Sequence, residues 1–326
     1  MPLSTDTYNI IKAASNADFD NEYYYALYSI VDTTVTVNGL SLPLVAGVII
    51  NTGIISISAT ANVFIIGDKK TSVDAPTTLS NYPEPTPPEP EPDGIITENL
   101  VLHVDAGNTD SYPGSGTLLT DLTGNYNATL VNGVGFTPDD EGALVFDGVD
   151  DYGTFGNVLN FGTGDAWTVS IWFNNAQTLA STGNIYGLIS KRDINNVNGW
   201  TISLRGGAAK GLIIRFTTTG LTSDLAPVAD YTSTFSDGNW HNLTVTYGTD
   251  DIGKLYVDGV FEVQKSFPNY DFTNTRRLLL SSFEDNTNFP TNQLPLNGKI
   301  SQTAIYDTDL SAEDVLYNYN VIKTRY

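Results

Sequence analysis

The chain of 326 residues contains no cysteine, only two histidines, and charged residues at only 16% of its positions. Without cysteine, disulfides and thiolate metal sites are excluded. The low share of charged residues, against about a quarter in ordinary domains, argues against long salt-bridged surface helices. No G-x-S-x-G, H-E-x-x-H or phosphate-loop motif occurs in the sequence. We therefore predict that the chain is not an enzyme.

Basic residues are scarce compared with acidic ones. The chain has 15 lysines and arginines against 37 aspartates and glutamates, for a formal net charge of -22. Such a surface repels phosphate backbones, so nucleic acid is not an expected partner. The acidity serves solubility, repulsion between neighbouring copies, or the binding of calcium, and composition alone does not separate these uses.

Long apolar runs are also missing. The first twenty residues have no basic segment followed by an apolar one, so we expect no secretory signal peptide. No stretch approaches the roughly 20 apolar residues of a membrane-spanning helix. We expect the protein to be made in a cytoplasm without a cleaved signal and to have no membrane span.

Proline and glutamate gather in one segment, residues 71–94, which ends YPEPTPPEPEPDG. This composition favours extended polyproline II and does not form a packed element. The segment predicts a linker between two domains, residues 1–70 and residues 95–326. Either one domain binds a surface and the linker holds the other domain away from that surface, or the linker only prevents the two domains from colliding.

Residues 1–70 predict a small β-sandwich or barrel. Strands at Thr33–Val37 and Leu40–Leu44 flank Asn38-Gly39, which is typical of a two-residue hairpin turn. About seventy residues form a thin core. We expect this domain either to complete its core as a homo-oligomer or against a partner surface, or to be a stable β-domain by itself.

Residues 95–326 predict an all-β sandwich with many short strands and one terminal helix. In His241–Gly248, Leu243, Val245 and Tyr247 alternate with polar residues, so they should share one face. Trp240 should bury its ring between two sheets. The predicted strands are Leu100–Val104, Leu144–Phe146, Trp167–Phe173, Tyr186–Ser190, Trp200–Leu204, Gly211–Phe216, Asn239–Tyr247, Lys254–Val257, Leu278–Ser281 and Leu296–Tyr306.

Two further local signals lie in this domain. Ser311-Ala312-Glu313-Asp314 has the pattern of a capping box at the start of the helix. Asp258-Gly259 predicts a hairpin turn between two strands.

Several segments of the sequence resemble motifs of one protein family, and they occur in the same order as in that family. They are NLVLHVDAGNTD from Asn99, ALVFDGVDDYGTF from Ala143, WTVSIWF from Trp167, DGNWHNLTVTY from Asp237, GKLYVDGV from Gly253 and LNGKISQTAIYDTDLSAEDVLYNY from Leu296. The chain resembles laminin-G-like, concanavalin-type lectin domains of the kind found in bacteriophage structural proteins and bacterial surface proteins. The resemblance implies an antiparallel jelly-roll sandwich. Some glycosidases with this sandwich use an E-x-D-x-E strand, which this sequence lacks.

The acidic segment Asp147-Gly148-Val149-Asp150-Asp151 allows two interpretations. Asp and Gly in this pattern form tight turns. Clustered carboxylates also suit calcium, which related sandwiches often bind. The candidate metal ligands are Asp121, Asp147, Asp150 and Asp151.

Exposed aromatic rings could stack on sugars. The candidates are Trp200, Tyr186, Tyr231 and Phe289, each of which could instead be a core or rim residue.

The sequence therefore favours a non-catalytic bacteriophage virion protein, either a capsid decoration or a fibre-type protein. Residues 1–70 would bind a capsid or tail protein, and the sandwich would lie at the virion surface, where it could bind host or environmental glycans. The alternative is a carbohydrate-binding, lectin-like adhesin module of a bacterial surface protein.

Overall fold

The computed structural model describes residues 94–179, 183–192, 198–207, 211–219, 221–283 and 293–326, and only the backbone of the strands before residue 94. The chain divides into two compact units, Met1–Pro90 and Glu91–Tyr326, and each is described by itself. Nearly all of the predicted linker, residues 71–94, lies outside the described residues. Within the described part, no helix is long and apolar enough to cross a membrane.

The first unit contains two four-stranded sheets, in the orders β1-β8-β3-β6 and β2-β7-β4-β5. β4 and β5 pair as antiparallel neighbours with Val37 opposite Leu40, as the predicted hairpin requires. A closed sandwich or barrel stays a prediction. The strands are β1 (Ile10–Ala13), β2 (Ala17–Asp18), β3 (Tyr23–Tyr28), β4 (Thr33–Val37), β5 (Leu40–Leu44), β6 (Ile50–Asn51), β7 (Ser56–Ala59) and β8 (Val63–Lys69).

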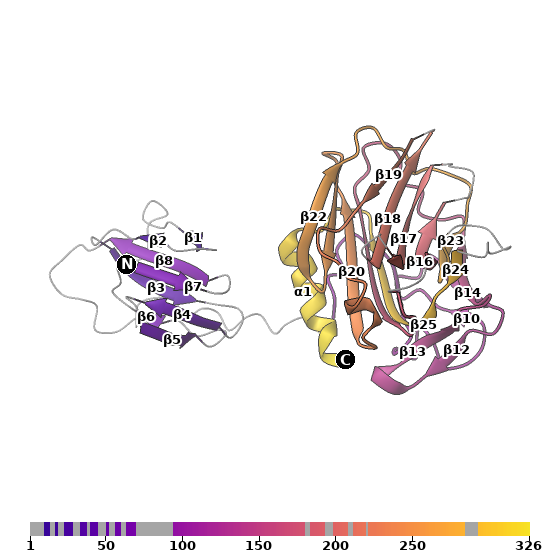
Figure 1. Ribbon diagram of the computed structural model, residues 1–326, viewed down its shortest axis with the longest axis horizontal. Coiled ribbons are helices and arrows are strands. Elements are labelled where there is room, and N and C mark those ends of the chain that lie inside the picture. Colours follow the sequence, from indigo (N-terminus) through magenta and orange to yellow (C-terminus); the bar gives the residue numbers. More distant parts are fainter. Residues whose placement is uncertain are drawn as a thin grey trace. The chain divides into compact units, whose positions relative to one another are not determined.

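The second unit is a sandwich of two large sheets, antiparallel except where β24 runs parallel to β16 (Figure 1). The nine-stranded sheet has the order β10-β11-β14-β23-β16-β17-β18-β19, with β24 beside β16. Its strands are β10 (Leu118–Leu119), β11 (Ala128–Val131), β14 (Tyr152–Gly156), β16 (Ile185–Lys191), β17 (Gly199–Arg205), β18 (Gly211–Thr218), β19 (Leu221–Leu225), β23 (Leu278–Leu280) and β24 (Gln293–Pro295).

The eight-stranded sheet has the order β12-β13-β25-β15-β20-β21-β22, with β9 beside β25. Its strands are β9 (Leu100–Asp105), β12 (Gly135–Thr137), β13 (Ala143–Asp147), β15 (Trp167–Asn175), β20 (Trp240–Tyr247), β21 (Ile252–Val257), β22 (Val260–Ser266) and β25 (Asn297–Tyr306). A helix, α1 (Ala312–Ile322), follows β25, and the 3-10 turn η4 (Lys323–Arg325) follows the helix. The two sheets confirm the predicted all-β sandwich.

The main core lies between the sheets and is dominated by aromatic rings. Trp167 is 0% exposed, and its ring stacks on Trp200 at 5.5 Å and on Tyr247 at 5.9 Å between ring centres. Leu243, Val245 and Tyr247 all enter this core, as the period-2 alternation of β20 predicts. These rings lie at strand ends, since Trp167 begins β15 and Tyr247 ends β20.

The outer face of the eight-stranded sheet is covered as well. α1 packs Val315 and Ile322 against Trp172, Tyr256 and other outward-pointing side chains of the sheet (Figure 1). The same face also buries polar residues. Thr244 and Asn242 of β20 are buried, and both donate hydrogen bonds to the Ser170 hydroxyl of β15. The outer face is therefore a second packed layer rather than a solvated one.

Two local predictions are confirmed. Ser311 accepts a hydrogen bond from the backbone of Asp314, whose side chain bonds back to the Ser311 backbone, so the capping box is complete. The hairpin between β21 and β22 turns through Asp258 (φ 50°) and Gly259 (φ 76°), both in the left-handed region that a type I′ turn requires.

The prediction that Trp240 buries its ring between the two sheets is wrong. Trp240 and the core residue Leu243 are an odd number of positions apart on β20, so their side chains lie on opposite faces of the strand. Trp240 therefore points outward with Asn242 and Thr244. Its ring is half-buried and stacks on Tyr326 at 4.4 Å. This outward tryptophan leads to the candidate site.

Candidate functional site

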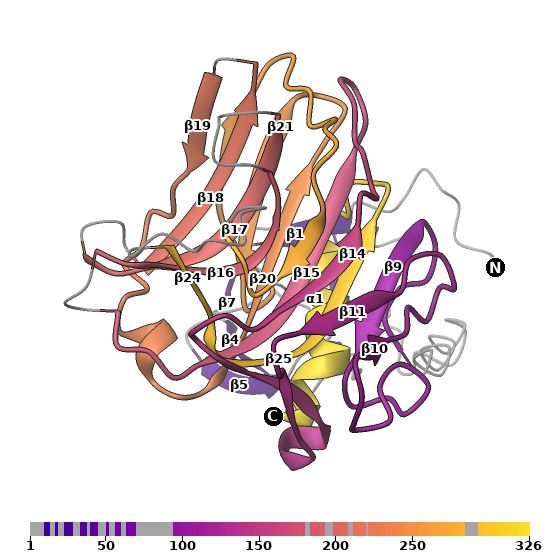
Figure 2. The same ribbon diagram turned by 90° about the vertical axis from the view of Figure 1, so that its right-hand side faces the viewer.

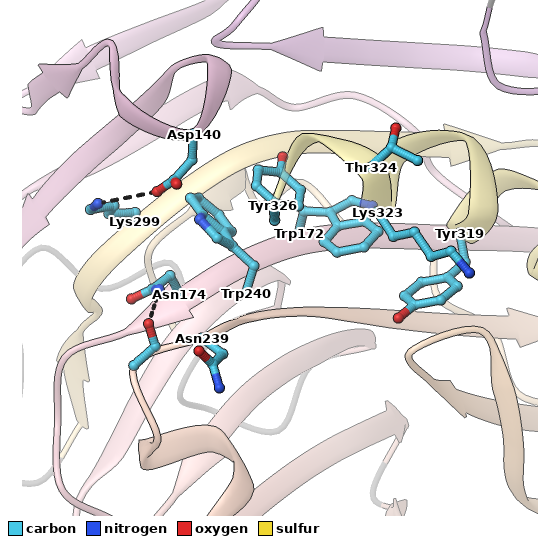
Figure 3. A pocket seen from close by; sticks show the side chains of 11 residues that line it. Asp140, Trp172, Asn174, Asn239, Trp240, Lys299, Tyr319, Lys323, Thr324 and Tyr326 are labelled. Atoms are coloured by element: carbon cyan, nitrogen blue, oxygen red, sulfur yellow. Dashed lines mark hydrogen bonds and ion pairs between the residues drawn. The ribbon is translucent and has the colours of Figure 1, made fainter.

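A pocket of about 650 Å³ lies on the outer face of the eight-stranded sheet, at the C-terminal end of α1 (Figure 3). Its volume is in the range of natural ligand sites. Strands β15, β20 and β25 supply its floor, α1 and η4 supply one wall, and the turn Asp139–Glu141 supplies another. The lining combines four aromatic rings with six polar or charged side chains, so it can offer both ring contacts and hydrogen bonds to a ligand.

Strand register places three pocket residues side by side. In the β15–β20 ladder Asn174 is opposite Trp240, and in the β15–β25 ladder Asn174 is opposite Lys299. Residues directly opposite one another in a ladder share a face of the sheet. Lys299, Asn174 and Trp240 therefore form a row across three adjacent strands, pointing away from the main core.

Four aromatic rings, of which Trp240 is one, contact one another in series (Figure 3). Successive ring centres are 5.3 Å apart from Tyr319 to Trp172, 5.0 Å from Trp172 to Tyr326 and 4.4 Å from Tyr326 to Trp240. Trp172 is only 4% exposed, so its faces are occupied by its neighbours. Trp240 is the ring at the end of this series that lies beside Asn174 and Lys299.

The polar groups around Trp240 keep open hydrogen-bonding capacity. The Asn174 side chain donates to the Gly238 carbonyl at 2.6 Å, and the Asn239 side chain donates to Asp237 at 2.9 Å. No described residue donates to the amide oxygens of Asn174 or Asn239, so both oxygens can accept from a ligand. Asp140 and Lys299 add an ion pair with a separation of 3.6 Å.

Arg325 fastens two walls of the pocket. Its guanidinium donates to both carboxylate oxygens of Asp105, at 2.8 and 2.9 Å, and pairs with Glu141. The neighbouring Tyr326 is thereby held over Trp240, with its hydroxyl against Ser301. Burial raises the pKa of the Tyr326 hydroxyl to about 12, so it is neutral at physiological pH.

A second candidate site lies where the chain crosses from β13 to β14. Asp147, Asp150 and Asp151 each offer an oxygen, and these oxygens lie within 4.8 Å of one another. Calcium–oxygen distances of about 2.4 Å allow ligands this far apart on opposite sides of one ion. Asp151 is 3% exposed, and its Oδ1 has no hydrogen-bond partner. Burial, with the charges of Asp147 and Asp150, raises the pKa of Asp151 despite a backbone hydrogen bond from Asp147.

Asp121 is not part of this cluster. It is 2% exposed and already accepts hydrogen bonds from the backbone amides of His103, Thr123, Asn125 and Tyr126 and from the Thr123 hydroxyl. Both of its oxygens are used in shaping the turn before β11. The three residues of the 147–151 segment are thus brought together, and Asp121 is not.

The aromatic residues expected to bind sugar do not gather. Trp200 is 0% exposed within the main core, and Tyr186 is 2% exposed, so neither offers a ring face to a ligand in this structure. The hydroxyl of Tyr231 donates to Glu262 at 2.8 Å, and its ring stacks on Phe235. Phe289 lies outside the described residues. The tryptophans that line the pocket are Trp240 and Trp172.

A signal for the pocket was present in the sequence. In β15 the inward positions are Trp167, Val169, Ile171 and Phe173, while the outward ones run Thr168, Ser170, Trp172 and Asn174. A tryptophan on an otherwise polar face is unusual. The contribution of residues 299 and 319–326 could not be seen, because only folding brings them to β15.

Comparison with known proteins agrees with this fold. Residues 147–316 match the family model of laminin G type that is described as the concanavalin A-like lectin/glucanases superfamily. The chain belongs to this superfamily. The superfamily's name covers both lectins and glucanases. Among curated proteins, no match was found.

Two solved structures show the same concanavalin A-like fold. The binding domain of Paraclostridial Mosquitocidal Protein 1 is 20% identical with a TM-score of 0.54, over 68% of this chain and 52% of that one. The ligand-binding domain of botulinum neurotoxin serotype D, in complex with N-acetylneuraminic acid, is 18% identical with a TM-score of 0.52, over 68% of this chain and 51% of that one. The present chain thus spans about half the length of each of these two solved structures. Neither is a phage protein, so they lend no support to the predicted virion role.

Proposed function

We propose that the sandwich is a non-catalytic carbohydrate-binding module of a lectin-like or adhesin protein, and that the pocket beside Trp240 is its sugar site. The observation that supports this most is the row formed by Lys299, Asn174 and Trp240. The amide oxygens of Asn174 and of the nearby Asn239 can accept hydrogen bonds from a ligand there. Sugars have an apolar ring face, which packs on an aromatic ring, and hydroxyls, which need fixed donors and acceptors.

Two general features support binding rather than catalysis. Enzymes of this class need a pair of carboxylates flanking the bond to be broken. The described pocket contains a single carboxylate, Asp140, and that group is paired with Lys299. Both similar solved structures are named as binding domains.

The test is glycan binding by the whole chain and by Trp240→Ala. Removing the ring should weaken sugar binding by at least tenfold, because stacking is lost while the rest of the sheet remains. Phe261→Ala is the matched control, since Phe261 is an exposed aromatic residue, 49% exposed, on β22 and does not line the pocket. Binding that survives Trp240→Ala, or release of reducing sugar from the glycan, would contradict the proposal.

We also propose that Asp147, Asp150 and Asp151 bind calcium. The support is the convergence of their oxygens within 4.8 Å and the buried, unpartnered Oδ1 of Asp151. A hard cation would give that oxygen a partner and would neutralise three carboxylates held close together. Calcium there would stiffen the crossing between the two sheets and is not required to contact the sugar.

A place on a virion surface remains a separate proposal, supported by the family resemblance and the order of anchor, spacer and display domain in the sequence. Residues 1–70 would bind a capsid or tail protein, as an oligomer. Peptide mass spectrometry of density-purified particles tests it. The chain should be present in stoichiometric amount, and its presence only in a soluble or cell-surface fraction would leave the bacterial adhesin as the function.

A further inference from the structure

We propose that the Asp140–Lys299 pair recognises two adjacent hydroxyls of an uncharged sugar ring stacked on Trp240. This inference rests on the proposed function and adds the class of sugar and the residues that select it. Lys299 reaches the site from β25, and Asp140 reaches it from the turn before β13, on the same side of Trp240 (Figure 3).

The separation within the pair leaves both groups able to bind a ligand. The Nζ of Lys299 and the Oδ2 of Asp140 are 3.6 Å apart, which is longer than a direct hydrogen bond between charged groups. A carboxylate accepts from a hydroxyl, and an ammonium donates to one. Two neighbouring hydroxyls of one ring would therefore bridge the pair, one donating to Asp140 and the other accepting from Lys299.

The backbone holds Asp140 in place before any ligand arrives. Asp140, Glu141 and Gly142 have φ values of 54°, 60° and 106°, which are left-handed conformations in succession. Non-glycine residues keep such backbone only where the surroundings enforce it. Here Arg325 pairs with the Glu141 carboxylate and is itself fixed by Asp105. The turn thus presents Asp140 to the pocket while Glu141 faces Arg325.

The local charge argues against an acidic sugar on Trp240. Next to the ring there is one negative and one positive group, and the chain as a whole has a formal net charge of -22. A sugar carboxylate bonded to Lys299 would also approach Asp140 and would compete with it for the ammonium. The other lysine of the pocket, Lys323, lies at the opposite end, 5.4 Å from the centre of the Tyr319 ring (Figure 3).

The experiment compares uncharged glycans with the same glycans ending in N-acetylneuraminic or glucuronic acid, using the whole chain. We expect the uncharged glycans to bind and the acidic ones to bind at least tenfold more weakly. Asp140→Asn and Lys299→Met should each weaken binding of the uncharged ligand by at least tenfold. Asparagine tolerates left-handed backbone, so Asp140→Asn removes the charge without disturbing the turn. Unchanged thermal midpoints check that each variant is folded.

The outcomes separate this inference from the proposed function. If acidic glycans bind best and Trp240→Ala abolishes that binding, the sugar site stands and the selection by Asp140 and Lys299 is wrong. If uncharged glycans bind but Asp140→Asn has no effect, the inference is also wrong. If no glycan binds, both are overturned.

Discussion

His241 lies between two carboxylates on the strand that begins at Trp240. Its Nδ1 is 2.9 Å from Asp258, its Nε2 is 3.3 Å from Asp237, and the side chain is nearly buried. Burial lowers the pKa of His241, but the hydrogen bonds and charges of Asp258 and Asp237 outweigh burial and raise the pKa above its usual 6.5. The histidine is therefore structural, and it ties the loop before Trp240 to the β21–β22 hairpin.

This arrangement predicts a pH dependence of stability. A raised folded-state pKa means that protonated His241 stabilises the fold fully below pH of about 6.5, and the contribution is lost as pH rises through the folded-state value. His241→Gln should therefore lower the free energy of unfolding more at about pH 5.5 than at about pH 8.5. Urea unfolding measures the difference, and an equal loss at both pH values would contradict it.

Asp151 provides the test of the calcium site. At saturation of about a hundred times Kd, calcium should stabilise the chain by about 2.7 kcal/mol. For a domain of this size that raises the thermal midpoint by about 5–10 °C. Asp151→Asn should abolish the increase. Without calcium the same variant should be as stable as the parent or more so, because the raised pKa of Asp151 shows that its charged form is disfavoured in the fold.

The control for this prediction is Asp110→Asn. Asp110 is exposed and lies outside the acidic cluster, so its variant should keep the full response to calcium. An equal increase in Asp151→Asn and in the parent chain would place the ion elsewhere.

At the scale of elements, η4 is fastened to β9 and to the turn before β13 through Arg325. The Arg325 and Asp105 side chains are 11% and 13% exposed, and removing the arginine leaves Asp105 as an unpaired, nearly buried charge. Arg325→Ala should lower the free energy of unfolding by about 3 kcal/mol. It should also weaken sugar binding, since both Tyr326 and Asp140 lose their support. Urea unfolding and glycan titration measure the two effects.

Lys254→Ala is the matched control for that prediction. Its pair with Asp309 is longer, at 3.9 Å, and more exposed, at 25% and 33%. Removing it should cost less than about 1 kcal/mol. Equal losses in the two variants would mean that the Arg325 pair is as weak as an ordinary surface pair.

Elements with strong local patterns were predictable. The ten strands expected after the linker all exist, with ends that differ by a few residues, because each has a continuous apolar or alternating run. The capping box around Ser311 and the Asp258-Gly259 turn act through neighbours in the sequence, so they too were visible. Strands such as β10, β12 and β19 were missed because they are short or, like LTSDL in β19, mostly exposed or half-buried. Their strand conformation comes from pairing with a neighbour.

At the scale of the whole molecule, the excess of acidic residues should make stability depend on salt. With a net charge of -22, the acidic side chains of the folded chain repel one another. Salt shortens the range of that repulsion from about 30 Å at 0.01 M to about 8 Å at 0.15 M. If screening recovers about 1 kcal/mol, the thermal midpoint should rise by about 2–4 °C. Calorimetry in sodium chloride, without calcium, measures this. A lower midpoint at higher salt would show that attractive pairs dominate.

The sequence by itself determined the all-β class, the superfamily and the absence of thiol chemistry, because composition and ordered local motifs carry them. It offered Asp121, Asp147, Asp150 and Asp151 as metal ligands, and only the structure showed that Asp121 stands apart from the other three. Only the tertiary structure decided which aromatic rings are available. Trp200 and Trp240 both occur at strand starts, yet one is enclosed by two sheets and the other faces outward. The pocket joins residues 140, 174, 240, 299 and 326, and strand pairing and the docking of the C-terminal segment bring them together. Side-chain alternation sets which face a residue takes, but what covers that face is set by elements distant in the chain.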